Sequence, residues 1–526
     1  MEHDMEFKVI LVTARTAVIE LCKEGYYETS EEYQILVNGN LKMTSNHVVQ
    51  SIYGLKPNTE YKLQIQRQTS DGSLTSEIVT IQTEYEEVTL NVRDFGAKGN
   101  GVDDDTTFIQ CAICACPQNS RVLIPEGYYK ITSLFLKSDI KIELSQGAVL
   151  MADTNRNRYP ILPGRIESYD ETKEYNLGTW EGNPLNSFAG IITGINVTNV
   201  EITGQGRIDG NASNQNWWEN AKVLRIAWRP RLIFLNHCTN IIIQGITVCN
   251  SPAWNIHPYF CTNLRFLDLR ILNPKDSPNT DGLDPESCKN VEIVGVYFSL
   301  GDDCIAIKSG KIYMGSKYKQ PSENLMIRQC CMRDGHGSIT IGSEMAGGVK
   351  NLVVRECLFI NTDRGLRIKT RRGRGKDAII DGILFENIKM DHVMTPIVIN
   401  CFYYCDPDGH SDYVQSKEDY PVDERTPYVG ELTFKNITCT NCHAAAAYMY
   451  GLPEQKIKKV TFENVRIFFA NRPKAGVPAM MDGVGETTLM GVLANNIESL
   501  ILKDFVVEGN QGEAFLIRNV DHVHRS

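Results

Sequence analysis

The chain has 526 residues, a formal net charge of −10, and 42% hydrophobic and 22% charged residues. This length exceeds one ordinary compact core, so it predicts either two domains or one elongated repeat structure. No apolar run approaches the roughly 20 residues of a membrane span, and the negative charge argues against a nucleic acid partner, so neither a membrane nor a nucleic acid is expected to bind.

The first 25 residues carry early acidic residues and interrupt their apolar stretch with Arg15 and Glu20. A secretion signal has a different order, with basic residues first, then an apolar run and small residues. We therefore expect a cytoplasmic protein, and a secreted protein that has lost its signal is the alternative. The sixteen cysteines are scattered among apolar neighbours, as is typical of small buried hydrophobic residues.

Residues 6 to about 84 contain short runs that alternate apolar and polar residues, separated by turn residues. This pattern predicts a small antiparallel β-sandwich over residues 1–86. The stretch Leu55-Lys-Pro-Asn-Thr-Glu-Tyr61 resembles the corner of fibronectin type III domains, in which a tyrosine closes the turn between two strands. The core tryptophan of that family is absent, because the first tryptophan is Trp180. We expect a spacer or docking module.

A different pattern covers residues 87–526, in which an asparagine precedes a short alternating apolar strand again and again. The units begin at Asn199, Asn240, Asn263, Asn290, Asn324 and Asn351, at intervals of roughly 20 to 40 residues. Each strand is too short to bury its apolar face alone, so the units must stack, and the asparagine amides can form a ladder. This predicts a parallel β-helix. Leucine-rich repeats share the period but need a regular run of leucines that is absent here.

Four polar clusters interrupt the repeat, and they lie one coil apart. They are Asn279-Thr-Asp281-Gly, Gly301-Asp302-Asp303, Gly335-His336-Gly337 and Arg367-Ile-Lys369. If consecutive coils stack in register, these side chains line one face and form a groove floor of carboxylates beside a histidine and two cations.

Paired carboxylates are the groups that hydrolysis of a glycosidic bond requires. With inversion, one protonated carboxyl group gives its proton to the leaving oxygen, and a second carboxylate takes a proton from water. Crowding of like charges raises at least one pKa, which keeps an acid protonated. A water molecule between the two carboxyl groups requires them to lie about 6.5 to 9.5 Å apart. Side chains that extend diagonally between coils about 4.8 Å apart can reach this separation.

The four clusters, in this order, resemble the motifs of the polygalacturonases, glycoside hydrolase family 28. The stretches 92–106, 204–210 and 250–257 are similar to other parts of that family, and the likeness covers roughly residues 90–470. The resemblance implies a right-handed β-helix that cleaves α-1,4 bonds between galacturonic acid units by inversion. It also implies no cofactor and no metal, and pectin or an oligogalacturonide as substrate.

Carried over position by position, the resemblance makes Asp302 the general acid and gives Asp281 and Asp303 the task of activating water. His336 would then tune Asp302, and Asn279 would contact the substrate. In isolation, Asn279 and Asp281 are also ordinary turn residues, and His336 is also an ordinary turn histidine between glycines.

Arg367 and Lys369 alternate onto the same side of a strand, where they can bind a uronate carboxylate. The surrounding residues 364–376 hold seven basic side chains, which form either an anion-binding patch or a solvated loop. The aromatic run 402–404 contributes Tyr404 as a candidate sugar platform, with core packing as the alternative for part of it.

The segment between Asp303 and His336 is longer than in short fungal-type members of the family, so added loops there are expected to close one end of the groove. Closure binds a chain end and favours exo-action, as does the resemblance to bacterial members with a fibronectin-like front domain. The alternatives are a rhamnogalacturonan or other branched-pectin hydrolase, a polysaccharide lyase on the same fold, and a carbohydrate-binding β-helix without activity. The sequence does not predict an oligomeric state.

Overall fold

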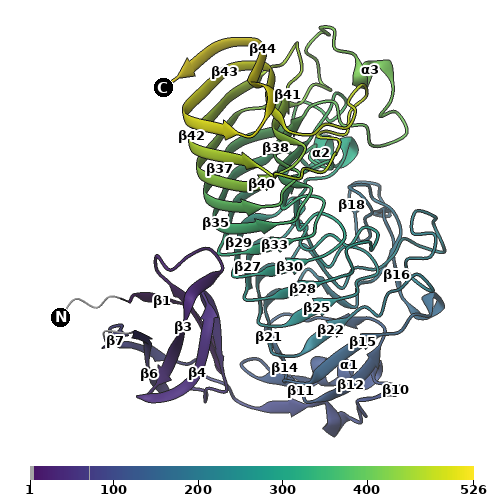
Figure 1. The fold of residues 1–526 in the computed structure, drawn as a ribbon. Helices are drawn as coiled ribbons and strands as arrows, with labels where there is room; N and C mark the ends of the chain where they lie inside the picture. Colours follow the sequence, from purple (N-terminus) through teal and green to yellow (C-terminus); the bar gives the residue numbers. More distant parts are fainter. Residues whose placement is uncertain (1–4, 70–71) are drawn as a thin grey trace.

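The computed structural model describes residues 5–69 and 72–526, and it consists of a small domain of antiparallel sheets followed by a long stack of parallel strands (Figure 1). Nearly all of the regular structure is strand, so the all-β class predicted from the sequence is confirmed. Within the described ranges, none of the helices combines the length and the apolarity that crossing a bilayer requires.

The front domain packs two antiparallel sheets around a small core that contains Ile19, Tyr33 and Ile65. One sheet has the order β1 (Phe7–Val12), β2 (Thr16–Leu21), β5 (Val49–Tyr53). The other has the order β4 (Asn40–His47), β3 (Glu28–Val37), β6 (Glu60–Thr69), β7 (Gly72–Thr75), with β8 (Val79–Gln82) also on β6. The Tyr61 hydroxyl accepts a hydrogen bond from the backbone N–H of Lys56 at 2.9 Å, so this tyrosine closes the turn before its own strand.

The long part is a right-handed parallel β-helix whose coils contribute strands to three stacks. The first stack contains β9 (Thr89–Asn91), β11 (Arg121–Ile124), β14 (Ile140–Leu144), β21 (Thr198–Gly204), β24 (Thr239–Gln244), β27 (Thr262–Leu267), β29 (Lys289–Val294) and β32 (Ser322–Arg328). The second contains β10 (Asn100–Asp104), β12 (Gly127–Ile131), β15 (Ala148–Ala152), β22 (Arg207–Asp209), β25 (Thr247–Cys249), β28 (Arg270–Leu272), β30 (Tyr297–Ser299) and β33 (Cys331–Arg333).

The third stack carries the polar clusters that the sequence singled out. It contains β13 (Leu134–Phe135), β20 (Ile192–Ile195), β23 (Ile233–Asn236), β26 (Ile256–Tyr259), β31 (Ile305–Ile307), β34 (Ile339–Ile341), β36 (Arg364–Lys369), β38 (Thr395–Asn400) and β41 (Ala445–Tyr450). Leu283 bridges β26 and β31. Toward the C-terminus, longer single strands extend from one stack into the next. They are β35 (Val349–Ile360), β37 (Ile379–Asp391), β40 (Glu431–Cys442), β42 (Ile457–Phe469), β43 (Met490–Glu508) and β44 (Gln511–Arg525).

The predicted asparagine ladder is present. The repeat asparagines adopt left-handed φ values, which asparagine tolerates better than most residues. From Asn240 to Asn351, each donates its side-chain amide to the asparagine of the preceding coil, whereas Asn199 donates to Asp139. The donors Asn240, Asn263, Asn290, Asn324 and Asn351 make these bonds at 3.0 to 3.3 Å. The ladder fixes the turn and therefore the register of successive coils.

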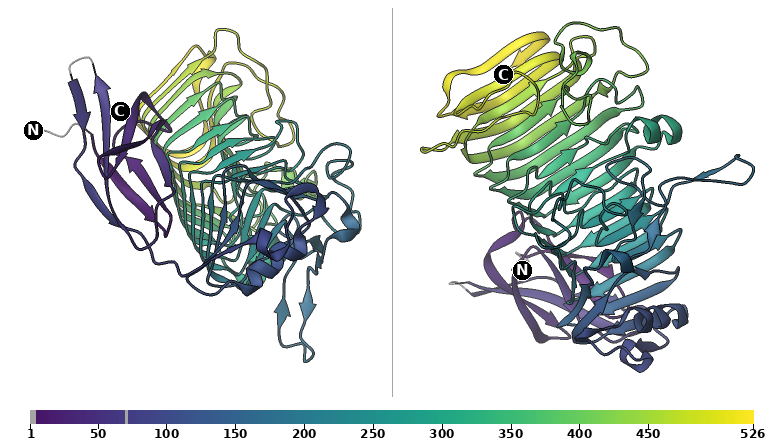
Figure 2. Two further views of the ribbon diagram at one scale, coloured as in Figure 1. Left: turned by 90° about the horizontal axis from the view of Figure 1, so that it is seen from below. Right: turned by 90° about the vertical axis from the view of Figure 1, so that its right-hand side faces the viewer.

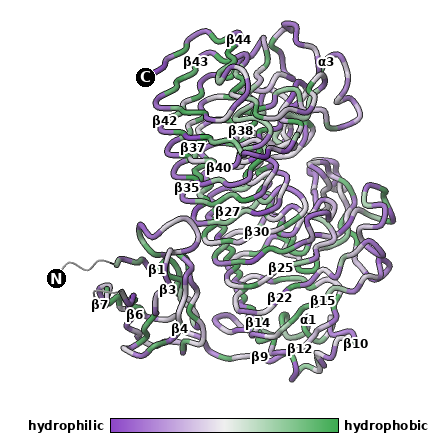
Figure 3. The backbone as a smooth tube through the Cα atoms, viewed as in Figure 1, coloured by the Kyte–Doolittle hydropathy of each residue, from purple (hydrophilic) through white to green (hydrophobic). Residues whose placement is uncertain are grey.

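Apolar side chains of every coil point into one continuous core, and apolar and polar positions alternate along the chain (Figure 3). Aromatic rings stack through it, with Phe434 lying 5.8 Å from Phe385 and 5.0 Å from Phe462 between ring centroids. Helix α1 (Thr106–Ala115) covers the first coils with Ile109 and Ile113, so the N-terminal end of the stack is not left open.

The front domain docks against the side of the β-helix, as Figures 1 and 2 show from three directions. Val49 packs against Leu267 and Val294 in a shared apolar cluster. Beside it, Arg328 binds both carboxylate oxygens of Glu20, at 2.9 and 2.8 Å, and both side chains are buried. A buried bidentate pair fixes the orientation of one domain on the other.

Replacing Arg328 by alanine should loosen this docking. The change leaves the Glu20 carboxylate buried without its partner, which costs about 3–5 kcal/mol when a buried pair is broken. We expect a lower melting temperature and faster proteolytic cleavage between β8 and β9. Arg466→Ala is the matched control, because its ion pair with Asp504 is at the surface; equal effects of the two variants would contradict a docking role.

Candidate functional site

The four predicted polar clusters meet on the third stack because its coils are in register. Leu283, Ile305, Ile339 and Leu366 pair in turn, so Asp281, Asp303 and Gly337, each two positions before its paired residue, lie side by side, and Arg367 directly follows Leu366 on the next coil. The backbone N–H of Gly282 donates to Asp303, and that of Cys304 donates to Gly337, which continues the ladder through the polar turns. The side chains of this row therefore lie one coil apart.

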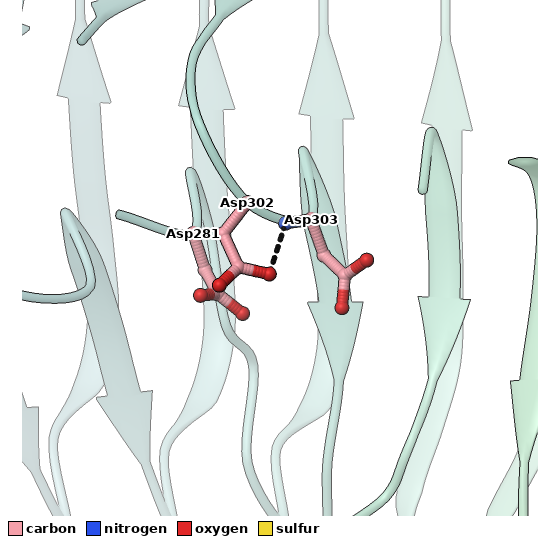
Figure 4. Close-up of side chains that lie close together, drawn as sticks. All are labelled: Asp281, Asp302 and Asp303. Atoms are coloured by element: carbon pink, nitrogen blue, oxygen red, sulfur yellow. Dashed lines mark hydrogen bonds between the residues drawn. The ribbon is translucent and has the colours of Figure 1, made fainter. Parts of the chain in front are cut away.

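Three carboxylates form the centre of the site (Figure 4). Asp281, Asp302 and Asp303 can each offer one oxygen so that all three oxygens lie within 4.8 Å of one another. The backbone N–H of Asp303 donates to Asp302 Oδ1 at 2.9 Å, which fixes the Asp302 side chain. The cluster is tighter than the separation of about 6.5 to 9.5 Å that the sequence argument assumed, because Asp281 and Asp302 turn toward one another across adjacent coils.

Asp303 is held by both predicted cations. Lys369 Nζ lies 2.8 Å from Asp303 Oδ2, and Arg367 Nη1 lies 3.2 Å from Asp303 Oδ1. Burial by itself would raise the pKa of Asp303, but the charges of Lys369 and Arg367 hold that pKa well below its ordinary value. Asp303 is therefore an anion over the whole working pH range and a weak proton acceptor.

Asp281 has the opposite electrostatic environment. Burial raises its pKa well above the ordinary value, and the charge of Asp302 raises it further, while Lys308 opposes the shift. Because its side chain is almost fully buried but lines the cavity, Asp281 can receive a proton from a molecule bound there. Asp281 and Asp303, to which the sequence resemblance gave the same task, thus differ in their affinity for a proton.

His336 lies beside Asp302, with Nδ1 at 3.4 Å from Asp302 Oδ1. The hydrogen bond with Asp302 raises the pKa of His336, and burial opposes that shift. The imidazole remains half exposed to the cavity. It can hold a proton next to Asp302 and neutralise the charge of that carboxylate.

Asn279 lines the same cavity and occupies the left-handed turn of its coil, with φ of 55°. Its Oδ1 accepts a hydrogen bond from Arg229 Nη2 at 2.6 Å, which fixes the side chain and leaves its amide N–H groups toward a ligand. Arg229 is buried and also donates to the carbonyl of Pro252.

Of the adjacent tyrosines, Tyr403 rather than Tyr404 lines the cavity. The Tyr403 ring lies 5.6 Å from Lys369 Nζ and 5.9 Å from the Arg367 guanidinium carbon. Tyr404, the candidate from the sequence, stacks on His410 at 4.7 Å outside that lining. Both tyrosines follow β38 in an irregular segment, so the sequence alone does not indicate which of them faces the cavity.

Sequence reasoning missed several residues of the site. Lys308 is almost fully buried, and its ammonium lies 3.0 Å from Glu344 and 3.8 Å from Asp281. Alternation from the inward-facing Ile305 and Ile307 would have indicated that Lys308 faces the site. A second missed feature lies beside the lining residue Trp254, where Arg231 is held between two tryptophan rings, 4.9 Å from the Trp180 centroid and 5.0 Å from the Trp254 centroid.

The predicted site residues other than Tyr404, together with Lys308 and Tyr403, line a cavity of about 600 Å³. Three further segments contribute Glu181, Lys311 and Asp406 to the same lining. The backbone N–H of Lys311, just before α2 (Ile312–Tyr318), donates to Gly182, and the Lys311 ammonium pairs with Asp406. Tyr313 and Tyr318 both donate to Glu174 in the projecting hairpin of β17 (Ile166–Glu167) and β18 (Glu174–Tyr175), which Figure 2 shows. The segment after Asp303 thus contributes Lys311 to the cavity lining.

The basic stretch 364–376 is not an open anion-binding patch. Arg371 pairs with Asp408, Arg372 with Glu454 and Arg374 with Asp406, and all three arginines are buried. Only Lys376 has the exposed position of a solvated loop residue. The arginines fix the loop that contributes Asp406 and Tyr403 to the cavity.

The three carboxylates also have the composition of a metal site. A divalent cation would have to compete with Lys369 and Arg367 for the oxygens of Asp303, and Lys308 already faces Asp281. The negative charge of the cluster is therefore balanced by the chain itself.

Comparison with known proteins supports the sequence resemblance. The model of glycosyl hydrolases family 28 matches residues 114–478. A probable polygalacturonase from Vitis vinifera is 31% identical over 392 residues, which are 72% of this chain and 74% of that protein. An exo-poly-alpha-D-galacturonosidase from Dickeya chrysanthemi is 26% identical over 416 residues, which are 69% of this chain and 65% of that protein.

Among solved structures, the family 28 exopolygalacturonase of Yersinia enterocolitica superposes with a TM-score of 0.70 at 21% identity. The match covers 98% of this chain and 98% of that one, so the two proteins share a fold that includes the front domain.

The contact between His336 and Asp302 can be tested by titration. Replacing Asp302 by asparagine removes the acceptor and the charge that raise the pKa of His336, so nuclear magnetic resonance should show a lower imidazole pKa. Asp363→Asn is the control, because Asp363 raises the same pKa least among the neighbouring groups. An equal drop in both variants would rule out a specific pairing.

Proposed function

The chain belongs to glycoside hydrolase family 28, and from this premise we propose that it is a polygalacturonase. It hydrolyses α-1,4 bonds between galacturonic acid units of pectin or of oligogalacturonides. The observation that carries the proposal is the cluster of Asp281, Asp302 and Asp303 beside Arg367 and Lys369 in one cavity. A carboxylate cluster supplies acid and base, and the cations favour an acidic sugar.

In this mechanism Asp302 is the general acid. Its carboxyl group faces the cavity, and the protonated His336 beside it can return a proton between turnovers. As the bond between the anomeric carbon and the glycosidic oxygen breaks, that oxygen takes the proton of Asp302. A water held by Asp281 and Asp303 bonds to the anomeric carbon and loses a proton to a carboxylate. Arg367 retains guanidinium N–H groups that can donate to the uronate carboxylate.

The proposal includes inversion at the anomeric carbon. Lys369 and Arg367 occupy both oxygens of Asp303, so this carboxylate is poorly placed to attack carbon as a nucleophile. The short oxygen separations, by contrast, approach the spacing of about 5–5.5 Å found between the carboxyl groups of retaining enzymes. The stereochemistry of the product therefore separates the two mechanisms.

Exo-action is the second part of the proposal. Its support is the meeting of three separate segments beside the cavity, where Lys311 contacts Gly182 and Asp406, and we propose that these segments close one end of it. A closed end admits a chain terminus and stops a longer polymer. The front domain, which we propose is a fibronectin type III module over residues 1–86, serves as a docked spacer on the β-helix of residues 87–526.

Other functions receive less support. A branched-pectin hydrolase would not need the Arg367 and Lys369 pair, and a lyase would need a basic residue to abstract a proton in place of the acid and water-activating base. A binding protein without activity would not need three clustered aspartates.

A time course on polygalacturonate tests the function and its mode together. We expect saturated mono- or digalacturonate from the outset, no ultraviolet absorbance from a new double bond, and no loss of activity with a chelator. The Asp302→Asn variant should be slower by about 10²- to 10⁴-fold, the usual contribution of a general acid. Long and short oligomers appearing equally early would exclude exo-action, and unsaturated products would make the enzyme a lyase.

Proton nuclear magnetic resonance of the first product tests inversion. Because the substrate bond is α, an inverting enzyme releases the β anomer first, and the α anomer appears later by mutarotation. Initial release of the α anomer would show retention and would give one of the aspartates a nucleophilic role.

A further inference from the structure

Two lysines in the lining of the cavity are not used by the proposed mechanism. Lys222 and Lys275 both line the cavity, and both are exposed to solvent. Within the described part of the chain, neither ammonium group takes part in an ion pair or a hydrogen bond. A lysine ammonium is a donor only, so each of these groups still offers all three of its N–H bonds to a ligand.

The other cations of the lining contact acceptors of the protein itself. These contacts join Lys308 to Glu344, Lys311 to Asp406, Arg367 and Lys369 to Asp303, and Arg364 to the carbonyl of Val477. An acidic substrate shares those cations with the protein, whereas Lys222 and Lys275 are wholly available to it.

Lys275 is held at the corner of a tight turn. The carbonyl oxygen of Pro274 accepts the backbone N–H of Ser277 at 3.1 Å and its hydroxyl at 2.5 Å, which places Lys275 between them at an exposed position. The turn packs directly on Gly301, where a β-carbon would lie 2.8 Å from the Pro274 oxygen and 2.5 Å from the Ser277 oxygen. Gly301 precedes Asp302, so the turn of Lys275 lies next to the proposed general acid.

Lys222 is on a loop that its own residues close. The backbone N–H of Val223 donates to the Asn220 carbonyl at 2.9 Å, and Asn220 has a left-handed φ of 49°. Arg225 Nη1 lies 3.0 Å from Glu219 Oε2 across the base of the loop. These contacts form a turn with Lys222 at its corner.

The order of the coils places the two lysines and Arg367 on different sides of Asp302. The third stack runs from β23 through β26, Leu283 and β31 to β34 and β36. The segment of Lys222 leads into β23, and that of Lys275 leads to Leu283. Asp302 precedes β31, and Arg367 is on β36. Because the lining residues come from successive coils, the cavity extends along the stack on both sides of Asp302.

We propose that Lys222 and Lys275 form a second uronate-binding site, which takes the carboxylate of a sugar on the side of Asp302 opposite Arg367. Every unit of a galacturonan chain carries a carboxylate, so a chain whose scissile bond lies at Asp302 has carboxylates on both sides of that bond. Arg367 receives one of them, and the two lysines receive another. The lysines determine specificity and touch none of the reacting atoms. This assignment rests on the proposed polygalacturonase function.

Binding to an inactive variant tests the site without turnover. In the Asp302→Asn background, calorimetry with trigalacturonate and with its full methyl ester separates charge from shape, because the ester lacks the negative charges. Lys222→Gln and Lys275→Gln should each weaken binding of the free acid about two- to fivefold, and the double variant about tenfold, as expected for exposed ion pairs. Binding of the ester should not change, and Lys275→Arg should retain the affinity for the free acid. Lys42→Gln is the matched control, because Lys42 is an exposed lysine of the front domain.

Asp276, beside Lys275 on the same turn, provides a test of opposite sign. Its exposed carboxylate also lines the cavity and repels a uronate. Asp276→Asn should therefore raise the preference for the free acid over the ester, and a lower preference would contradict an electrostatic origin. Added salt should reduce this preference more in the protein with both lysines than in the double variant, because salt screens exposed charges.

Two results would overturn the proposal. Equal weakening of acid and ester in the double variant would mean a structural effect, and unchanged affinities would mean that the lysines do not bind the substrate.

Turnover separates this proposal from the proposed function. If the wild-type protein hydrolyses polygalacturonate, the double variant should raise KM about tenfold and keep kcat within about twofold, because a contact made equally in the ground and transition states changes KM alone. Unchanged KM in an active enzyme would overturn the lysine site and leave the function standing. If the wild-type protein does not hydrolyse polygalacturonate but the lysines still contribute to binding of trigalacturonate, the proposed function alone fails.

Discussion

Holding three carboxylates side by side, two of them buried, is the constraint on which the site depends. Asp281, Asp302 and Asp303 would repel one another and lose much hydration if nothing compensated them. The chain compensates with cations from other coils: Lys369 and Arg367 bind Asp303, and Lys308 faces Asp281. These cations are distributed unevenly over the three carboxylates. As a result Asp303 stays an anion, whereas Asp281 can accept a proton.

The β-helix allows this because residues of consecutive coils lie only one coil spacing apart in space, although they are many positions apart in the sequence. The asparagine ladder and the paired strands fix the register, so residues as far apart as Asp281 and Arg367 lie on the same face. Side chains that alternate outward in one coil lie beside their equivalents in the next. Loops that leave this regular frame, such as those of Gly182, Lys311 and Asp406, meet beside the cavity.

The sequence could predict the features that follow from periodicity. The asparagine repeat predicted the stacked coils. The four polar clusters predicted the three carboxylates, His336 and the two cations Arg367 and Lys369. It could not predict Tyr403 in place of Tyr404, or the position of Arg231 between Trp180 and Trp254, because these depend on the course of irregular loops. Lys308 lies between these cases: alternation within its strand indicates its face, but only the structure shows three carboxyl groups around it.

A crystal structure of the Asp302→Asn variant with a bound oligogalacturonide would test the central claim most directly. The account predicts that the scissile oxygen lies beside residue 302, that the anomeric carbon faces Asp281 and Asp303, and that a uronate carboxylate contacts Arg367. It also predicts that the end of the sugar chain stops at Lys311 and Asp406. A sugar chain that runs past this end, or whose carboxylates avoid Arg367 and Lys369, would contradict the account.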